Sequence, residues 1–366
     1  MDSKWPRWVF LVHSFFLENS DFFIVHFKPM YKCCLTFFVV LVTGGCVFAQ
    51  SIQMLAEGKS TSLRGLSAVN DQVVWVSGSG GTVGLSINAG KTWKWMQVPG
   101  FEKSDFRDIE AFSDREAVIM GITEPAVLLR TADGGTSWIR VFQDTGYTAF
   151  LDAMDFNGDY GAVIGDPQKG LILFARSSDQ GKSWTTPLPS GLDTATGGEA
   201  FFAASGSNIR LIKGNRPILV SGGKVSCLYM DHRRYPLQLN QGLETTGANS
   251  VAINPSDPNQ AFVVGGDFSR DTLSKGNSLL LQLNPFGQRP PKSAPRGYRS
   301  CVEYLSAHQM ICCGTTGVDI SSDGGLHWRG ISNQSFHICR KAKSGKTIFL
   351  AGARGAVARL NWDEAR

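Results

Sequence analysis

A basic side chain recurs at comparable points of several short apolar segments, such as SLRGLSAV and DFRDIEAF. Guanidinium groups present N–H donors in a fixed plane, so a cluster of them suits the bidentate capture of a carboxylate or phosphate. Five residues are therefore candidates for an anion-binding site: Arg64, Arg107, Arg299, His337 and Arg354. The alternative is that these arginines pair separately with local acids, such as Asp108 and Glu303, and only solubilise the surface.

Paired carboxylates offer a second chemistry, the general acid and base catalysis of glycosidic cleavage. Asp152, Asp155, Asp166 and Glu199 occur in the middle of the chain, at comparable levels of the repeating pattern described below. Asp152 and Glu199 are only weak catalytic candidates, because turns are rich in Asp for structural reasons. The sequence therefore assigns no catalytic residue.

The spacing of the remaining residues does not support metal or cofactor chemistry. Cys312 and Cys313 lack the Cys-x-x-Cys interval and no His stands at a ligand interval, so we expect no metal site. The glycines around Gly80 open no helix, so they do not indicate dinucleotide binding, and we expect no cofactor. Cys301 and Cys312 flank a turn and are expected opposite each other on adjacent strands. A disulfide and buried free thiols are both open at this point.

Four octapeptides of the form Ser/Thr-x-Asp/Asn-x-Gly-x-x-Trp supply turns that organise the chain. The Asp or Asn side chain accepts hydrogen bonds from nearby backbone amides, and the Ser or Thr hydroxyl adds to the turn. The Gly provides a positive φ without steric cost, and the Trp opens the next strand with a large apolar surface. The residues concerned are Ser86, Asn88, Gly90, Trp93, Thr131, Asp133, Gly135, Trp138, Ser177, Asp179, Gly181, Trp184, Ser321, Asp323, Gly325 and Trp328.

The octapeptides begin at positions 86, 131, 177 and 321, so their separations are 45, 46 and 144, and 144 is three times 48. A fixed period of this size, with turns between β-rich runs, is typical of a propeller. We therefore predict an all-β fold, a single seven-bladed β-propeller over residues 50–366. The count of seven comes from an apolar run ending in Gly that recurs at 74–78, 118–121, 162–165, 218–222, 261–265, 310–314 and 348–352.

The repeat alignment also predicts how the candidate residues are positioned. The first strand of each blade should line a central channel, and the basic residues come from units 1, 2, 6 and 7, which are neighbours in a closed ring. The last unit has room for only three strands, so we expect residues 52–55 to supply its outer strand and close the ring. Longer loops at 194–207 and 268–277 are where specificity is expected.

The N-terminal region reads as a targeting segment rather than part of the fold. Residues 30–49 have a basic start, a short apolar run and small residues before a cut near Ala49, which predicts a cleavable signal peptide. Residues 1–29 resemble neither a signal nor a domain and suggest a start codon assigned too early. A two-segment membrane leader and a lipid anchor at Cys46 are the alternatives. We therefore expect a secreted or periplasmic protein.

The octapeptides resemble Asp-box (BNR) repeats, and residues 50–366 are similar to the photosystem II stability/assembly-factor-like propellers, which include secreted bacterial members. The resemblance implies a seven-bladed scaffold that binds other proteins through an arginine-rich patch, and it transfers no catalytic residue. Sialidases share the octapeptide, but no Arg-Ile-Pro motif precedes Ser86 here.

We therefore expect a non-catalytic protein-binding or assembly scaffold, and the alternative is a carbohydrate-active hydrolase that uses the channel carboxylates. The expected partner is another envelope or secreted protein, or an acidic ligand or glycan, and we expect a monomer. The chain carries 36 basic and 31 acidic residues, for a net charge of +5. This balance is too mild to indicate nucleic-acid binding.

Overall fold

The computed structural model describes residues 50–123, 125–146, 149–186 and 194–362. The expected leader at 1–29 and signal peptide at 30–49 lie outside this part of the chain. The described residues form strands and one short 3-10 turn, η1 (Ala353–Gly355). Across these ranges, no helix is long and apolar enough to span a membrane.

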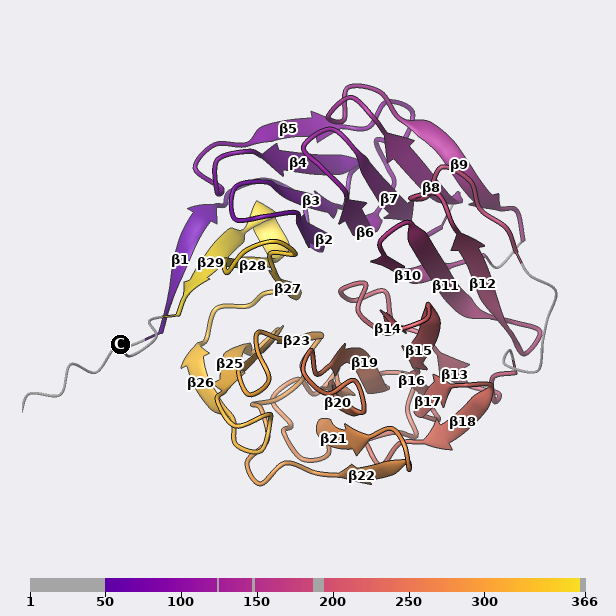
Figure 1. Ribbon diagram of the computed structural model, residues 1–366, viewed down its shortest axis with the longest axis vertical. Helices are drawn as coiled ribbons and strands as arrows, with labels where there is room; N and C mark the ends of the chain where they lie inside the picture. Colours follow the sequence, from indigo (N-terminus) through magenta and orange to yellow (C-terminus); the bar gives the residue numbers. More distant parts are fainter. Residues whose placement is uncertain (1–49, 124, 147–148, 187–193, 363–366) are drawn as a thin grey trace, which may run out of the picture. The chain divides into compact units, whose positions relative to one another are not determined.

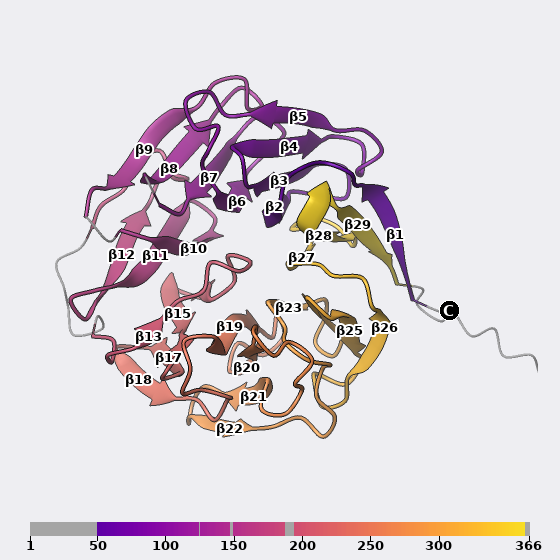
Figure 2. The same cartoon turned by 180° about the vertical axis from the view of Figure 1, so that it is seen from behind.

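Seven antiparallel sheets surround a common axis as blades, which confirms the predicted seven-bladed β-propeller (Figures 1 and 2). Each blade runs from an inner strand near the axis to an outer strand at the rim. Blade 1 contains β2 (Leu63–Ala68), β3 (Val74–Gly78), β4 (Thr82–Ser86) and β5 (Lys94–Gln97); blade 2 contains β6 (Phe106–Ala111), β7 (Ala117–Gly121), β8 (Ala126–Thr131) and β9 (Ile139–Asp144); blade 3 contains β10 (Leu151–Asn157), β11 (Tyr160–Gln168) and β12 (Leu171–Ser177).

The other four blades follow the same order, from the axis outwards. Blade 4 contains β14 (Ile209–Ile212), β15 (Arg216–Val220), β17 (Cys227–Met230) and β18 (Arg233–Pro236); blade 5 contains β19 (Thr246–Ile253), β20 (Gln260–Asp267), β21 (Ser278–Gln282) and β22 (Gly287–Arg289), extended by the short β13 (Glu199–Ala200) and β16 (Gly222–Gly223); blade 6 contains β23 (Cys301–Tyr304), β24 (Met310–Gly314), β25 (Gly317–Ser321) and β26 (Arg329–Ser332); blade 7 contains β27 (Ile338–Lys341), β28 (Ile348–Ala351), β29 (Val357–Asn361) and β1 (Ser51–Ala56).

The second strand of a blade is covered on both faces by neighbouring blades, which is why it reads as an unbroken apolar run. Every residue of β3, β7 and β24 is buried. Apolar side chains of adjacent blades interlock: Trp75 of blade 1 shares a cluster with Phe106 and Ile119 of blade 2. This packing fixes the position of the inner strands around the axis.

The four octapeptides form turns that follow the third strand of their blade and share one hydrogen-bond pattern. Ser177 Oγ accepts the N–H of Gly181 at 2.9 Å and donates to Asp179 Oδ1 at 2.7 Å. Asp179 Oδ1 also accepts the N–H of Ser183 at 3.0 Å, and Trp184 Nε1 donates to the carbonyl of Gly181 at 3.2 Å. Equivalent Ser/Thr and Asp/Asn hydrogen bonds recur in the turns at 86–93, 131–138 and 321–328.

Blade 7 is assembled from both ends of the described chain. Strand β1 pairs antiparallel with β29, with Ser51 opposite Asn361 and Ile52 opposite Leu360. Ile52, Met54 and Leu55 are partly buried against the apolar cluster of blades 1, 6 and 7. Figure 1 shows β1 alongside β29 at the rim of the ring.

The expected opposition of Cys301 and Cys312 is wrong by one residue. The register of β23 and β24 places Cys301 opposite Cys313 and Val302 opposite Cys312. Because side chains alternate between the two faces of a strand, Cys312 points to the other side of the sheet. All five cysteines of the described residues are buried free thiols.

Candidate binding site

The inner strands β2, β6, β10, β14, β19, β23 and β27 line the axis of the ring. Polar side chains near the starts of these strands gather at one end of the channel, which we call the Arg64 mouth; it is formed by Arg64, Arg107, Asp152, Asn249, Tyr298 and His337. Polar side chains near the strand ends gather at the opposite end, which we call the Arg340 mouth; it is formed by Glu110, Asp155, Arg210, Glu303, Arg340 and Lys343.

β-Bulges in three inner strands direct side chains toward the Arg64 mouth. In β2 the register shifts between Leu63 and Gly65, so Arg64 is the extra residue of a β-bulge. The same shift leaves Arg107 extra in β6 and Asp152 extra in β10. A bulge bends its strand and redirects the extra side chain away from the regular alternation. The bulges therefore explain why these side chains leave the sheets and turn to the channel mouth.

Arg64 and Arg107 lie close together without an acid for each of them. Arg107 Nε donates to Asp105 Oδ2 at 2.8 Å. Arg64 Nη1 donates to the carbonyl of Ala204 at 3.2 Å, and no carboxylate of the described residues lies within ion-pairing distance of it. Burial, and next the charge of Arg107, lower the pKa of Arg64. Two adjacent guanidinium groups therefore share one ion-paired carboxylate, that of Asp105, and an anion bound beside Arg64 would offset their repulsion.

His337 joins the two arginines as a neutral imidazole. Burial, then the charges of Arg64 and Arg107, lower its pKa to about 3. Its Nε2 lies 3.2 Å from Ser62 Oγ. A neutral ring beside two guanidinium groups adds hydrogen-bonding capacity without adding charge. The structure thus brings together three of the five predicted binding residues.

The other two predicted binding residues do not join this cluster. The guanidinium of Arg299 is fully buried in blade 6, where Nε donates to Asp319 Oδ2 at 2.8 Å and Nη1 donates to Thr316 Oγ1 at 2.7 Å. Arg299 precedes β23, which pairs with β24 without a register shift, so no bulge redirects its side chain. Arg354 is exposed in η1 at positive φ, and no ion pair within the described ranges links it to the cluster. Contrary to the prediction, Arg299 and Arg354 therefore lie apart from the cluster of Arg64, Arg107 and His337.

The predicted carboxylates lie apart, in separate surroundings. Asp152 is fully buried, and neither of its oxygens has a hydrogen-bond partner among the described residues. Burial, then the nearby Asp166, raise its pKa well above the usual value. Glu199 instead accepts hydrogen bonds from Tyr229 Oη at 2.6 Å and from the N–H of Thr196 at 2.9 Å, and Tyr229 lies where blade 4 packs on blade 3. Asp155 lies at the Arg340 mouth, so the expectation of one shared level is wrong.

A segment before β14 fills the middle of the channel between the two mouths. Ser205 Oγ donates to the carbonyl of Ser300 at 2.7 Å, and Ser207 Oγ donates to Ser250 Oγ at 2.8 Å. A Cβ at Gly206 would lie 2.1 Å from a carboxylate oxygen of Asp108, so only glycine fits there. We call residues 203–207 the plug, because they contact the inner strands of blades 1, 2, 5, 6 and 7.

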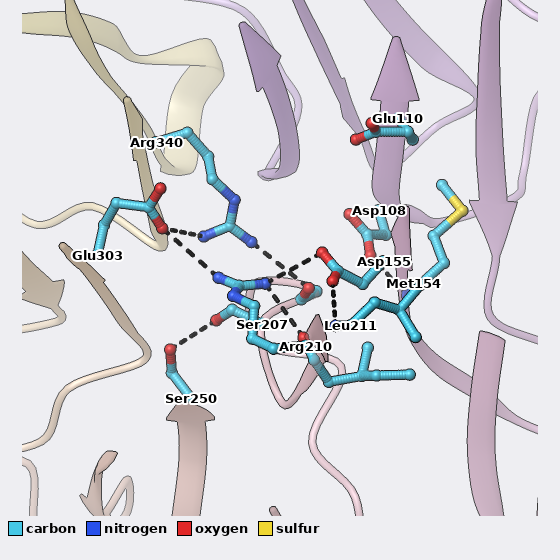
Figure 3. A network of polar contacts seen from close by, with 12 residues as sticks. Asp108, Glu110, Met154, Asp155, Ser207, Arg210, Leu211, Ser250, Glu303 and Arg340 are labelled. Atoms are coloured by element: carbon cyan, nitrogen blue, oxygen red, sulfur yellow. Dashed lines mark hydrogen bonds and ion pairs between the residues drawn. The ribbon is translucent and has the colours of Figure 1, made fainter. Parts of the chain in front are cut away.

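The Arg340 mouth is a cavity of about 470 Å³ lined by ion pairs (Figure 3). Glu303 lies 3.5 Å from Arg210 Nη2 and 3.7 Å from Arg340 Nη1, and Asp155 lies 3.6 Å from Arg210 Nη1. Arg340 Nη2 donates to the carbonyl of Ser205 in the plug at 3.2 Å. Burial raises the pKa of Glu303 and of Asp155. These pairs join blades 3, 4, 6 and 7 across the axis and stabilise the ring from inside.

Several residues of both mouths were not identified from the sequence. Tyr298 Oη donates to Asn249 Oδ1 at 2.8 Å at the Arg64 mouth, and Arg210 and Arg340 organise the opposite one. A usable signal exists: Arg340 follows His337 by three residues, as Glu110 follows Arg107 and Asp155 follows Asp152. That interval carries the chain from one end of a short inner strand to the other.

Comparisons with known proteins establish the fold. No protein-family model matches the chain, and a search of curated proteins finds no match. Among solved structures, it is similar to YCF48 bound to D1 peptide, with a TM-score of 0.62 and 16% identity over 86% of this chain and 95% of that chain. YCF48 from Cyanidioschyzon merolae has a TM-score of 0.60 and 15% identity over 85% and 99% of the two chains. The WD40 propeller domain of Doa1 has a TM-score of 0.60 and 14% identity over 86% and 98%. Identities this low establish the propeller alone.

Proposed function

We propose that this propeller is a non-catalytic protein-binding or assembly scaffold whose Arg64 mouth binds an acidic group of its partner. The observation that carries the proposal is the Arg64 guanidinium, which sits beside Arg107 with no carboxylate of the described residues paired to it. A carboxylate placed between the two arginines would gain charge-assisted hydrogen bonds from both. The similarity to YCF48 bound to D1 peptide supports a role in binding proteins, because a propeller of the same fold takes a peptide.

The hydrolase alternative receives less support from the geometry. Glycosidases place two carboxyl groups on either side of the scissile bond. Here the carboxylate of Glu199 is occupied by Tyr229 and by the N–H of Thr196, whereas Asp152 is fully buried beside Asp166. Cleavage of a glycosidase substrate panel that Asp152→Asn or Glu199→Gln abolishes would favour the hydrolase over the scaffold.

Three finer assignments belong to the same proposal. The four octapeptide turns are Asp-boxes that stabilise the outer corners of their blades. The pairing of β1 with β29 closes the ring. The chain acts as a monomer outside the cytoplasm after a cut near Ala49, and sequencing the N-terminus of the mature protein tests this: an intact N-terminus would contradict secretion through cleavage.

The binding proposal is tested with blocked peptides of defined charge. The probe is an unlabelled decapeptide of Gly and Ser with one central Glu, acetylated and amidated so that the Glu side chain is its only carboxylate, and its binding is measured by isothermal titration calorimetry. We expect Arg64→Gln to weaken binding to the full-length chain by about tenfold or more, since a buried charge-assisted pair is lost. The control is Arg115→Gln, an exposed arginine in the turn between β6 and β7 at the opposite end of blade 2. Equal binding by wild type, Arg64→Gln and the control would refute the proposal.

A further inference from the structure

Beside the Arg64 mouth lies an exposed apolar surface that has no part in the proposed capture of an acidic group. Phe268, Leu243 and Leu273 expose 47%, 50% and 38% of their surface, unusually large fractions for large apolar side chains. All three lie in the two connections that flank β19 and β20 at the end of blade 5 where the inner strand begins. We call Leu243, Phe268 and Leu273 the apolar rim.

Backbone and hydroxyl contacts hold the two connections of the apolar rim together. The N–H of Phe268 donates to the carbonyl of Thr245 at 3.1 Å, and the N–H of Leu243 donates to Thr246 Oγ1 at 3.1 Å. Asp267 Oδ1 accepts from Ser269 Oγ at 2.7 Å, which anchors the turn that presents Phe268. The exposure of Phe268 therefore belongs to a fixed loop that holds its ring in place.

A continuous path of contacts joins this rim to Arg64. The ring of Phe268 packs edge to face on Tyr298 and on Phe202, with centroids 6.2 Å and 5.9 Å apart. The carbonyl of Phe202 accepts the N–H of Ala204, whose own carbonyl accepts Arg64 Nη1. Tyr298 in turn belongs to the Arg64 mouth. The guanidinium and the exposed ring are thus two ends of one ordered surface.

An exposed aromatic side chain next to a largely desolvated arginine is typical of a protein-binding hot spot. An exposed apolar group contributes to binding only when the partner covers it with apolar surface. The surface therefore suits a ligand that carries one carboxylate and one large apolar side chain.

We propose that the Arg64 mouth and the apolar rim together bind an extended peptide segment of a partner protein. A Glu or Asp of the segment pairs with Arg64 and Arg107, and an aromatic or large aliphatic side chain a few residues away packs on Phe268 and Leu243. This peptide proposal rests on the proposed function and specifies which side chains the partner supplies. Extended backbone advances about 3.3 Å per residue, so a short peptide spans both features.

The experiment compares one blocked peptide with a series of blocked peptides on the full-length chain by isothermal titration calorimetry. The first is the Gly/Ser decapeptide with one Glu; the second series adds one Phe at positions two to five residues from the Glu. We expect at least one spacing to bind about tenfold more tightly than the first peptide. Phe268→Ser and Leu243→Ser should each remove most of that gain, and each should weaken the best Phe-containing peptide by a larger factor than the Glu-only peptide.

Matched variants separate the possible results. Ile139→Ser removes an apolar side chain that is 63% exposed on β9 of blade 2, away from the apolar rim of blade 5. It should change the affinity for neither kind of peptide. If Phe adds nothing at any spacing while Arg64→Gln still weakens both peptides, the apolar rim proposal is overturned and the proposed function stands. If neither peptide responds to Arg64→Gln, both fail. Tighter binding of a single-stranded oligonucleotide that competes with both peptides would also overturn the peptide proposal.

Discussion

At the scale of single residues, the acidic side chains of the blade corners are held in their charged form. Partial burial raises the pKa of Asp179, but hydrogen bonds led by those from Ser183 outweigh it and lower the pKa to about 2. The same balance holds for Asp323. Partial burial raises its pKa, but hydrogen bonds from the N–H and the ring of His327 outweigh that effect and lower the pKa to about 2. The turns that contain Asp179 and Asp323 therefore hold an ionised carboxylate.

We expect Asp179→Asn to make the stability of the folded protein less dependent on pH under acidic conditions. A carboxylate with a depressed folded-state pKa contributes stability that is present above its unfolded pKa and is lost as the pH falls through its folded pKa. For Asp179 that window extends from about pH 4 down to about pH 2. Thermal melting of wild type and variant should therefore differ at pH 6 and converge as the pH falls to 2. The melting temperature of Ser183→Ala should likewise approach that of wild type as the pH falls to 2. A difference from wild type that stays constant from pH 6 to pH 2 would contradict a stabilising role for the Asp179 carboxylate.

Residue-scale geometry also shows where sequence reasoning succeeded and where it failed. Arg64 and Arg107 each stand 14 residues before the Gly that ends the next strand, whereas Arg299 stands 15 before Gly314. Because side chains alternate along a strand, one residue decides which way a side chain points. The one-residue difference from Arg299 is therefore present in the sequence, but the bulges at Arg64 and Arg107 that give it its effect appear only in the structure.

At the scale of elements, the strands that the sequence located best are those buried on both faces. The apolar runs ending in Gly correspond to the second strands of the seven blades, since burial on two sides leaves an unbroken apolar pattern. The plug was not foreseen. It lies in the loop at 194–207, where the sequence predicted specificity, and its role in the channel arises from contacts with strands more than 90 positions away in the chain.

Strand β1 gives a direct test of the element scale. Deleting residues 51–57 removes the partly buried Ile52, Met54 and Leu55 and exposes the edge of β29. At about 1–2 kcal/mol for each of the three side chains, the loss of unfolding free energy should be on the order of 3–6 kcal/mol. Gln53→Ala, a change at an exposed position of the same strand, should cost far less. Urea denaturation measures both, and a truncated protein as stable as the full chain would show that β1 does not close the ring.

The plug is tested by two glycines that share a backbone conformation. Gly206 and Gly158 have φ of +60° and +63°, so an alanine at either costs about 1 kcal/mol in backbone strain. A Cβ at Gly158 would meet nothing within 4 Å, whereas one at Gly206 would meet the Asp108 carboxylate. Gly206→Ala should therefore lower the free energy of unfolding by about 3 kcal/mol or more, and Gly158→Ala by about 1 kcal/mol. Equal losses would mean that the plug is loosely packed.

At the scale of the whole molecule, the plug separates a binding end from a stabilising end. The ion pairs of the Arg340 mouth join blades across the axis, while Arg64 at the opposite mouth pairs with no acid of the described residues. This division assigns different consequences to charge changes at the two ends.

We expect Glu303→Gln to lower stability without changing peptide binding. The substitution removes the carboxylate shared by Arg210 and Arg340 and leaves two half-buried guanidinium groups facing each other. The cost should be about 1–3 kcal/mol of unfolding free energy. Binding of the Glu-containing peptide at the Arg64 mouth should stay within twofold of wild type. A large loss of binding with unchanged stability would invert the assignment of the two mouths.

The central claim is that Arg64 receives a carboxylate of a protein partner. A double-mutant cycle measures this directly, with Arg64→Gln in the full-length chain and Glu→Gln in the blocked peptide. We predict a coupling free energy of about 1–3 kcal/mol, because each change removes the same charge-assisted contact. Additive effects, with a coupling below about 0.3 kcal/mol, would contradict the account.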